Sequence, residues 1–153
     1  MQRFLLVSTL ALFTGCGPAA ESIDTGLPSG SFGGSAWTLG KAVVSRADDR
    51  LSVTLYSDAE KDVADCDDFA EVSTGYVIWS QPAEEGRREL KLAFGDPDGQ
   101  TVTFVTPPSD NAIITSGVLE VSALGDTSVT IGLNVTDGDE NALNGTFTAT
   151  LCD

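Results

Sequence analysis

Histidine is absent from this 153-residue chain. Its absence excludes the Ser-His-Asp and Cys-His forms of nucleophilic catalysis, together with every zinc site that needs an imidazole ligand. Basic residues are scarce, because 8 Lys and Arg stand against 23 Asp and Glu, for a net charge of −15. Such a charge repels phosphate backbones, so we expect no nucleic-acid partner. An acidic surface commonly serves solubility alone, but it also suits a cationic protein or a metal ion.

Long hydrophobic runs are also missing. The main apolar run, FLLVSTLALF at residues 4–13, has ten residues, whereas a membrane-spanning helix needs about 20. Because a short basic start precedes this run, we interpret residues 1–15 as a signal peptide. The carboxylates are abundant, but no spacing singles out two of them as a catalytic pair. We therefore expect a protein that is not an enzyme.

The stretch FTGC, which ends at Cys16, resembles the lipobox of bacterial lipoproteins, in which the signal peptide is cut before a cysteine whose thiol is acylated. The resemblance covers the first sixteen residues, and Phe13 stands where Leu is more usual. It implies that Cys16 is the lipidated first residue of the mature chain. Since Gly17 and not Asp follows, it also implies a lipid-anchored location in the bacterial cell envelope, at the outer membrane. The alternative is an ordinary secretory signal cut near Ala19 or Ala20.

Residues 16–34 are rich in Gly, Pro, Ser and Ala and show no hydrophobic period, so we interpret them as a lipidated, flexible tether. The folded domain is then expected over residues 35–153, which is enough chain for one core. Three cysteines are an odd number for a secreted protein. If Cys16 is acylated, Cys66 and Cys152 are left to form a disulfide in an oxidising compartment.

From residue 37 onward apolar and polar residues alternate, which predicts strands with one face in a core and the other in water. Turn-forming Gly, Pro, Asp and Asn separate these strands at short intervals. We therefore predict an all-β domain, a single antiparallel β-sandwich or small barrel of about eight strands. The predicted strands cover residues 36–44, 51–55, 73–80, 89–94, 101–104, 119–122, 128–135 and 146–151.

Residues 58–71, DAEKDVADCDDFAE, do not alternate in this way. We expect them to form one or two helical turns, or an acidic loop, that carries Cys66. In the last strand Phe147, Ala149 and Leu151 share the core-facing parity, so Cys152 is predicted to point away from the core. The disulfide would then be a clasp that fixes the acidic segment to the outside of the C-terminal strand.

One candidate metal site lies near the C-terminus. Asp137, Asp139 and Asn141 alternate as the first ligands of a calcium loop do. The later Gly and Glu of the full EF-hand pattern are missing, since Ala142 and Thr148 stand in their places. A hairpin turn explains the Asp-Gly pair equally well.

Three aromatic residues are candidates for binding carbohydrate or protein. Exposed aromatic rings offer flat, amphipathic contact area, whereas packing in the core is the alternative for tryptophan in a β domain. The candidates are Trp37, Tyr76 and Trp79.

The segments SAWTLG and LNGTFTATLC resemble the small all-β domains of uncharacterised bacterial lipoproteins, a resemblance that implies no activity. Our first hypothesis is a non-catalytic binding or structural module of the cell envelope, held to the membrane by its N-terminal lipid. The second is an acidic inhibitor of a basic secreted hydrolase such as lysozyme. The third is a calcium-binding module of the adhesion type, and only this one implies a cofactor.

Overall fold

The computed structural model describes residues 21–66, 72–93, 99–108 and 110–152. The described chain is all-β, apart from one 3-10 turn at Asp58–Glu60, so the predicted fold class is confirmed. In this part of the chain, no helix is long and apolar enough to cross a membrane. Ten strands are present, two more than predicted: β1 (Ser29–Phe32), β2 (Ser35–Ala47), β3 (Arg50–Ser57), β4 (Tyr76–Pro82), β5 (Gly86–Glu89), β6 (Val102–Thr106), β7 (Asp110–Ile114), β8 (Gly117–Leu124), β9 (Ser128–Thr136) and β10 (Ala142–Cys152).

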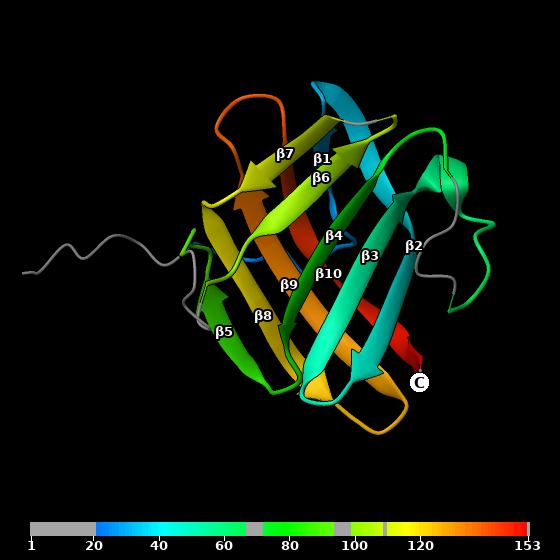
Figure 1. Ribbon diagram of the computed structural model, residues 1–153, viewed down its shortest axis with the longest axis vertical. Helices are drawn as coiled ribbons and strands as arrows, with labels where there is room; N and C mark the ends of the chain where they lie inside the picture. The colour runs from blue at the N-terminus through cyan, green and yellow to red at the C-terminus, as the bar shows by residue number, and fades with distance from the viewer. Residues whose placement is uncertain (1–20, 67–71, 94–98, 109, 153) are drawn as a thin grey trace, which may run out of the picture.

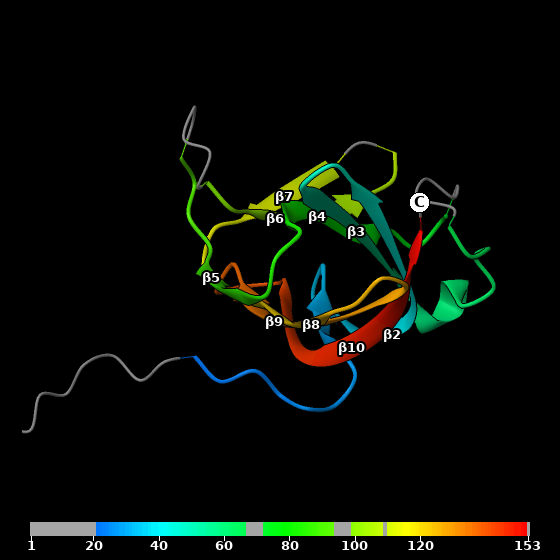
Figure 2. The ribbon, with the colours of Figure 1, turned by 90° about the horizontal axis from the view of Figure 1, so that it is seen from below.

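All ten strands belong to one sheet in the order β5-β8-β9-β10-β1-β2-β3-β4-β6-β7, and neighbours in this order run antiparallel. The sheet folds over on itself, so that β3, β4, β6 and β7 face β5, β8, β9 and β10 across the interior (Figures 1 and 2). Within the described residues the two outermost strands, β5 and β7, do not pair with each other. The sheet is therefore not closed, and the alternative of a small barrel is wrong.

The main core lies between the two facing parts of the sheet. It takes its side chains from alternate positions of each strand, because successive residues of a strand point to opposite faces. The parity predicted from the sequence is confirmed for three strands in particular. Their core-facing residues are Leu51, Val53 and Leu55 on β3, Val129, Ile131, Leu133 and Val135 on β9, and Phe147, Ala149 and Leu151 on β10.

One predicted strand is wrong, and two short strands of the structure were not predicted. The expected strand at residues 89–94 is wrong, since β5 ends at Glu89 and Leu92 is 53% exposed. Only Leu90 of that pattern is buried, and Phe94 lies outside the described residues. β1 and β7 have no counterpart in the prediction, because the sequences SGSF and DNAII are too short to show a period of two.

The predicted flexible tether is wrong for residues 21–34. This stretch lies against the outer face of β9 and β10 and then enters the sheet as β1 (Figure 2). Ile23 packs over Gly132, where an added Cβ would come within 2.8 Å of the Ile23 side chain. Asn134 Nδ2 donates a hydrogen bond of 2.7 Å to the carbonyl oxygen of Ser22. The folded domain therefore includes residues 21–34 and does not begin at residue 35.

Candidate functional site

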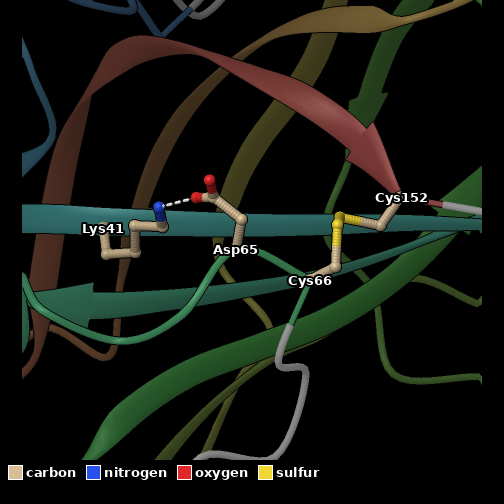
Figure 3. The surroundings of a disulfide bond; sticks show 4 residues. All are labelled: Lys41, Asp65, Cys66 and Cys152. Carbon is tan, nitrogen blue, oxygen red and sulfur yellow. Dashed lines mark hydrogen bonds and ion pairs between the residues drawn. A yellow bond between two sulfur atoms is a disulfide. The ribbon is translucent and has the colours of Figure 1, made fainter.

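The disulfide between Cys66 and Cys152 is present, with the two Cα atoms 5.5 Å apart (Figure 3). Its sulfur atoms lie away from the main core, as the parity of β10 predicts. Leu151 belongs to the main core, whereas Cys152 belongs to a second and smaller apolar cluster. The disulfide fixes the loop that follows β3 to the end of β10, so the predicted clasp is confirmed.

The second apolar cluster differs from the prediction, which treated the disulfide as an external link only. Cys152 is buried there against the outward-facing side chains of β2 and β3. The loop contributes apolar side chains of its own and so covers this patch of the sheet from outside. The cluster consists of Val43, Tyr56 and Cys152, with Val63, Val72 and Tyr76 packed around them.

Beside the disulfide lies a groove with a volume of about 350 Å³. One wall is residues 39–43 of β2 and the other is residues 147–150 of β10, and Asp65 and Cys66 close one side of it. Leu27, whose side chain is 62% exposed, contributes to the lining as well. This volume falls within the range of pockets that bind small ligands, about 300 to 1,000 Å³.

The groove exists because β2 and β10 diverge. β1 lies between them and pairs with both, at Asn144 of β10 and Thr38 of β2. Farther along, β2 and β10 pair directly and in parallel, but only at Val44 and Ser45 of β2. The groove lies between β1 and the point where β2 and β10 pair directly.

Gly40 makes the bend in β2 that this divergence requires. The pairing of β2 with β3 shifts register between Leu39 and Lys41, which is a β-bulge. A Cβ atom at Gly40 would lie 2.4 Å from the carbonyl oxygen of Ser57 and 2.5 Å from the Cα of Asp58. Only glycine fits at this position, because β3 and the following turn approach its backbone so closely.

The β10 wall presents backbone hydrogen-bonding groups to the groove. In a regular antiparallel strand, every second residue directs its N–H and C=O to the same neighbouring strand. The N–H of Thr146 points to the side of β1 and β2, because it donates to the carbonyl oxygen of Gly26 at 2.7 Å. The pairing of β10 with β9 is regular through this region. The N–H and C=O of Thr148 therefore point into the groove.

The direction of the backbone groups on the β2 wall can be assigned in the same way. The N–H of Leu151 is used on the far side of β10, where it donates to the carbonyl oxygen of Thr127 at 2.9 Å. Val44 therefore supplies the backbone groups that join β2 to β10. Two residues earlier, Ala42 points its N–H and C=O to the same side. Within the described chain neither Ala42 nor Thr148 belongs to the β2–β10 pairing, so both can bond to a ligand.

An ion pair lies at the groove. Lys41 on β2 donates from its Nζ to Oδ1 of Asp65 on the loop (Figure 3). The Asp65 side chain is 86% exposed, so its other oxygen is accessible to water or to a partner. An exposed pair of this kind contributes about 0 to 1 kcal/mol to stability. Its main effect is to define the charge at the groove.

The interpretation of the two tryptophans as exposed binding residues is wrong. Trp37 and Trp79 are 6% and 4% exposed, and both lie in the main core. Tyr76 is half-buried and packs against Tyr56 in the second cluster, with ring centroids 6.1 Å apart. Trp37, Trp79 and Tyr76 are therefore packing residues. The alternative reading of tryptophan as core is the correct one.

The candidate calcium residues form a hydrogen-bonded turn. Asp137 Oδ1 accepts from the backbone N–H groups of Asp139 and Asn141, at 2.9 and 3.0 Å, and Oδ2 accepts from the Asn141 amide at 2.7 Å. The Asn141 Oδ1 accepts from the N–H of Gly33 at 2.9 Å. No cluster of three or more Asp, Glu, Cys or His suited to a metal ion occurs in the described ranges. The alternation of Asp137, Asp139 and Asn141 is thus explained by a turn.

These hydrogen bonds also affect the ionisation of Asp137. Desolvation raises the pKa of its carboxyl group, but the hydrogen bonds from the Asn141 side chain and from the Asp139 and Asn141 backbone outweigh it. The net result is a pKa below the ordinary value. The charged form of Asp137 is therefore part of the folded turn.

Ala42 and Thr148, which lie beyond the β2–β10 pairing, were not among the site residues predicted from the sequence. One signal was available: Gly40 interrupts the alternation of residues 36–44, and a glycine inside a strand suggests a bulge or a close backbone contact. Cys16, the predicted lipidation site, lies outside the described residues. No protein-family model, no curated protein and no solved structure matches this chain.

Proposed function

We propose that this protein is a lipid-anchored, non-catalytic binding module of the bacterial cell envelope, with Cys16 as the acylated residue. The observation that carries the proposal is the disulfide between Cys66 and Cys152. It accounts for two of the three cysteines, and the remaining one ends the lipobox-like stretch FTGC. Disulfides persist outside the reducing cytosol, which agrees with export. The two facing parts of the sheet support a β-sandwich as the exported domain.

The corrected tether changes how the domain is held. Since residue 21 is already part of the fold, only residues 17–20 separate it from Cys16. Four residues span at most about 14 Å when fully extended. The domain is therefore held close to the membrane surface and not at the end of a long flexible tether.

Metabolic labelling with a radioactive fatty acid in a Gram-negative host tests the anchor. We expect label on the wild-type chain and on Cys66→Ser/Cys152→Ser, and none on Cys16→Ser. The double variant is the matched control, because it also removes thiols but leaves the anchor. Label retained on Cys16→Ser would show that another residue is acylated or that the label is not on this site.

A second candidate function is inhibition of a basic secreted hydrolase such as lysozyme. It is favoured by the loop at residues 58–66, which the disulfide fixes to the sheet. This segment has four carboxylates and one lysine, and acidic patches recognise cationic partners by electrostatic complementarity. Pull-down with a panel of cationic hydrolases at low and moderate salt tests it. Binding that weakens as salt rises supports inhibition, and an empty panel at low salt rejects it.

A further inference from the structure

We propose that the groove between β2 and β10 binds a short, extended segment of a partner protein that carries a lysine or arginine side chain. The segment adds to the sheet through the backbone groups of Ala42 and Thr148. This inference rests on the proposed binding function and names the chemistry of the ligand.

The fold already contains a strand in the same position. β1 lies between β10 and β2 and runs antiparallel to both, with Ser29 opposite Asn144 on one side and Thr38 on the other. The groove continues the line of β1 past Gly26, whose carbonyl oxygen accepts from Thr146. Because the edges on both sides have open donors and acceptors, extended backbone is the ligand that matches them.

The shape of the groove limits the length of the segment. β2 and β10 converge to direct pairing at Val44 and Leu151, so a long strand cannot pass through. The volume of about 350 Å³ accommodates a few residues. Phe147 and Ala149 belong to the main core, so the accessible apolar surface of the lining comes from Leu27, which is 62% exposed. An apolar side chain beside the basic one would cover this surface.

The charge of the surroundings favours a basic segment. The loop that borders the groove contains Asp58, Glu60, Asp62 and Asp65 against a single Lys61. Lys41 occupies one oxygen of Asp65, and the second oxygen can accept from a partner cation. A second copy of this chain is disfavoured as the occupant, because two molecules of charge −15 repel each other.

The groove is accessible when the protein is anchored. The N-terminal end of the described chain, in blue, lies on one side of the molecule, and the end of β10 lies on the other (Figure 2). A partner can therefore reach the groove while the lipid is in the bilayer.

The test uses the disulfide-bonded chain from residue 16, made soluble by Cys16→Ser, and three blocked tetrapeptides. The probes are acetyl-Lys-Val-Lys-Val-amide, the same peptide with N-methylated peptide bonds, and acetyl-Glu-Val-Glu-Val-amide. Nuclear magnetic resonance follows the amide signals of Ala42 and Thr148. We expect the basic peptide to shift both signals and to slow their hydrogen exchange by about tenfold or more. The N-methylated and acidic peptides should do neither.

Asp65→Lys and Asp126→Lys form a matched pair, since each changes the net charge equally but only Asp65 borders the groove. We expect Asp65→Lys to weaken binding of the basic peptide several-fold more than Asp126→Lys does. The proposal is overturned if neither amide responds, if the N-methylated peptide binds equally well, or if sedimentation shows that a second copy fills the groove. Fatty-acid labelling at Cys16 is a separate measurement. A failure of peptide binding therefore does not count against the lipid anchor, and a failure of labelling does not count against the groove.

Discussion

Leu151 and Cys152 are adjacent in β10, yet their side chains enter different apolar clusters. Leu151 packs in the main core between the facing parts of the sheet, and Cys152 packs with Val43 and Tyr56 on the outer face. The disulfide therefore organises a second layer of structure without entering the main core. The groove lies beside this second layer, where β2 and β10 diverge.

Removal of the disulfide should lower global stability but preserve the main core. The bond joins residues 86 apart in sequence, and a loop of this length is worth about 4 to 5 kcal/mol in the chain-entropy model. We expect Cys66→Ser/Cys152→Ser to lose an amount of this order in urea unfolding. Below the transition, the fluorescence of the buried Trp37 and Trp79 should stay that of the wild type. A red-shifted spectrum without urea would contradict the separation of the two clusters.

Hydrogen exchange should alternate along the groove wall of β10. Ala149 directs its N–H to β9, where the pairing is continuous, and Thr148 directs its N–H to the groove. We expect Thr148 to exchange far faster than Ala149 in the protein without ligand, because only the latter is in a ladder. Equal protection of the two amides would show that the groove edge is paired.

Gly40→Ala should be strongly destabilising. The added Cβ would meet backbone atoms of Ser57 and Asp58 at 2.4 and 2.5 Å, and backbone cannot yield as a flexible side chain can. We expect a loss of about 2 kcal/mol or more in chemical denaturation. Gly26→Ala is the control, since nothing lies within 4 Å of its added Cβ. A Gly40→Ala variant as stable as Gly26→Ala would contradict the bulge geometry.

A buried glutamine offers a test of the core. Gln81 is 0% exposed, and among the described residues neither Oε1 nor Nε2 has a hydrogen-bond partner. Burying an unpaired amide costs about 1 to 3 kcal/mol, so Gln81→Met should raise the melting temperature. Gln100→Met should lower it, because the Gln100 Nε2 donates to the carbonyl oxygen of Ser80 at 3.0 Å. Destabilisation by both variants would show that Gln81 is hydrogen-bonded.

The turn at Asp137 predicts a pH dependence of stability. The folded state holds the pKa of this carboxyl below its ordinary value of 3.8, so the unfolded state binds the proton more readily. Its stabilising contribution is present above about pH 4 and is lost as the pH falls through the folded pKa. Asp137→Ala should therefore destabilise at neutral pH and match the wild type more closely in acid. A loss of stability in Asp137→Ala that is the same at neutral pH and in acid would contradict this assignment.

The parts of the fold that the sequence predicted are those with a strong period of two. β9 and β10 alternate over nine and eleven residues, so their core-facing positions and the direction of Cys152 follow from parity alone. β1 and β7 have four and five residues, which is too few for a period to stand out from ordinary polar loops. β1 pairs with the next strand, β2, and also with β10, which is more than a hundred positions away in sequence, and such long-range pairing leaves no local signal.

The same reason explains why the groove was not predicted. It depends on the parallel contact of β2 with the end of β10, which joins residues more than a hundred positions apart. Trp37 and Trp79 were candidate binding residues because a sequence shows that an aromatic is present and not which face it occupies. The structure assigns both of them to the core.

Intact-mass and peptide analysis of the protein purified from membranes of a Gram-negative host tests the lipid anchor most directly. The account predicts a mature chain that begins at Cys16, with the mass of a diacylglyceryl group on its thiol. A chain that begins at Ala20 or Glu21 and carries no lipid would contradict it, and would show that residues 1–19 or 1–20 are an ordinary secretory signal.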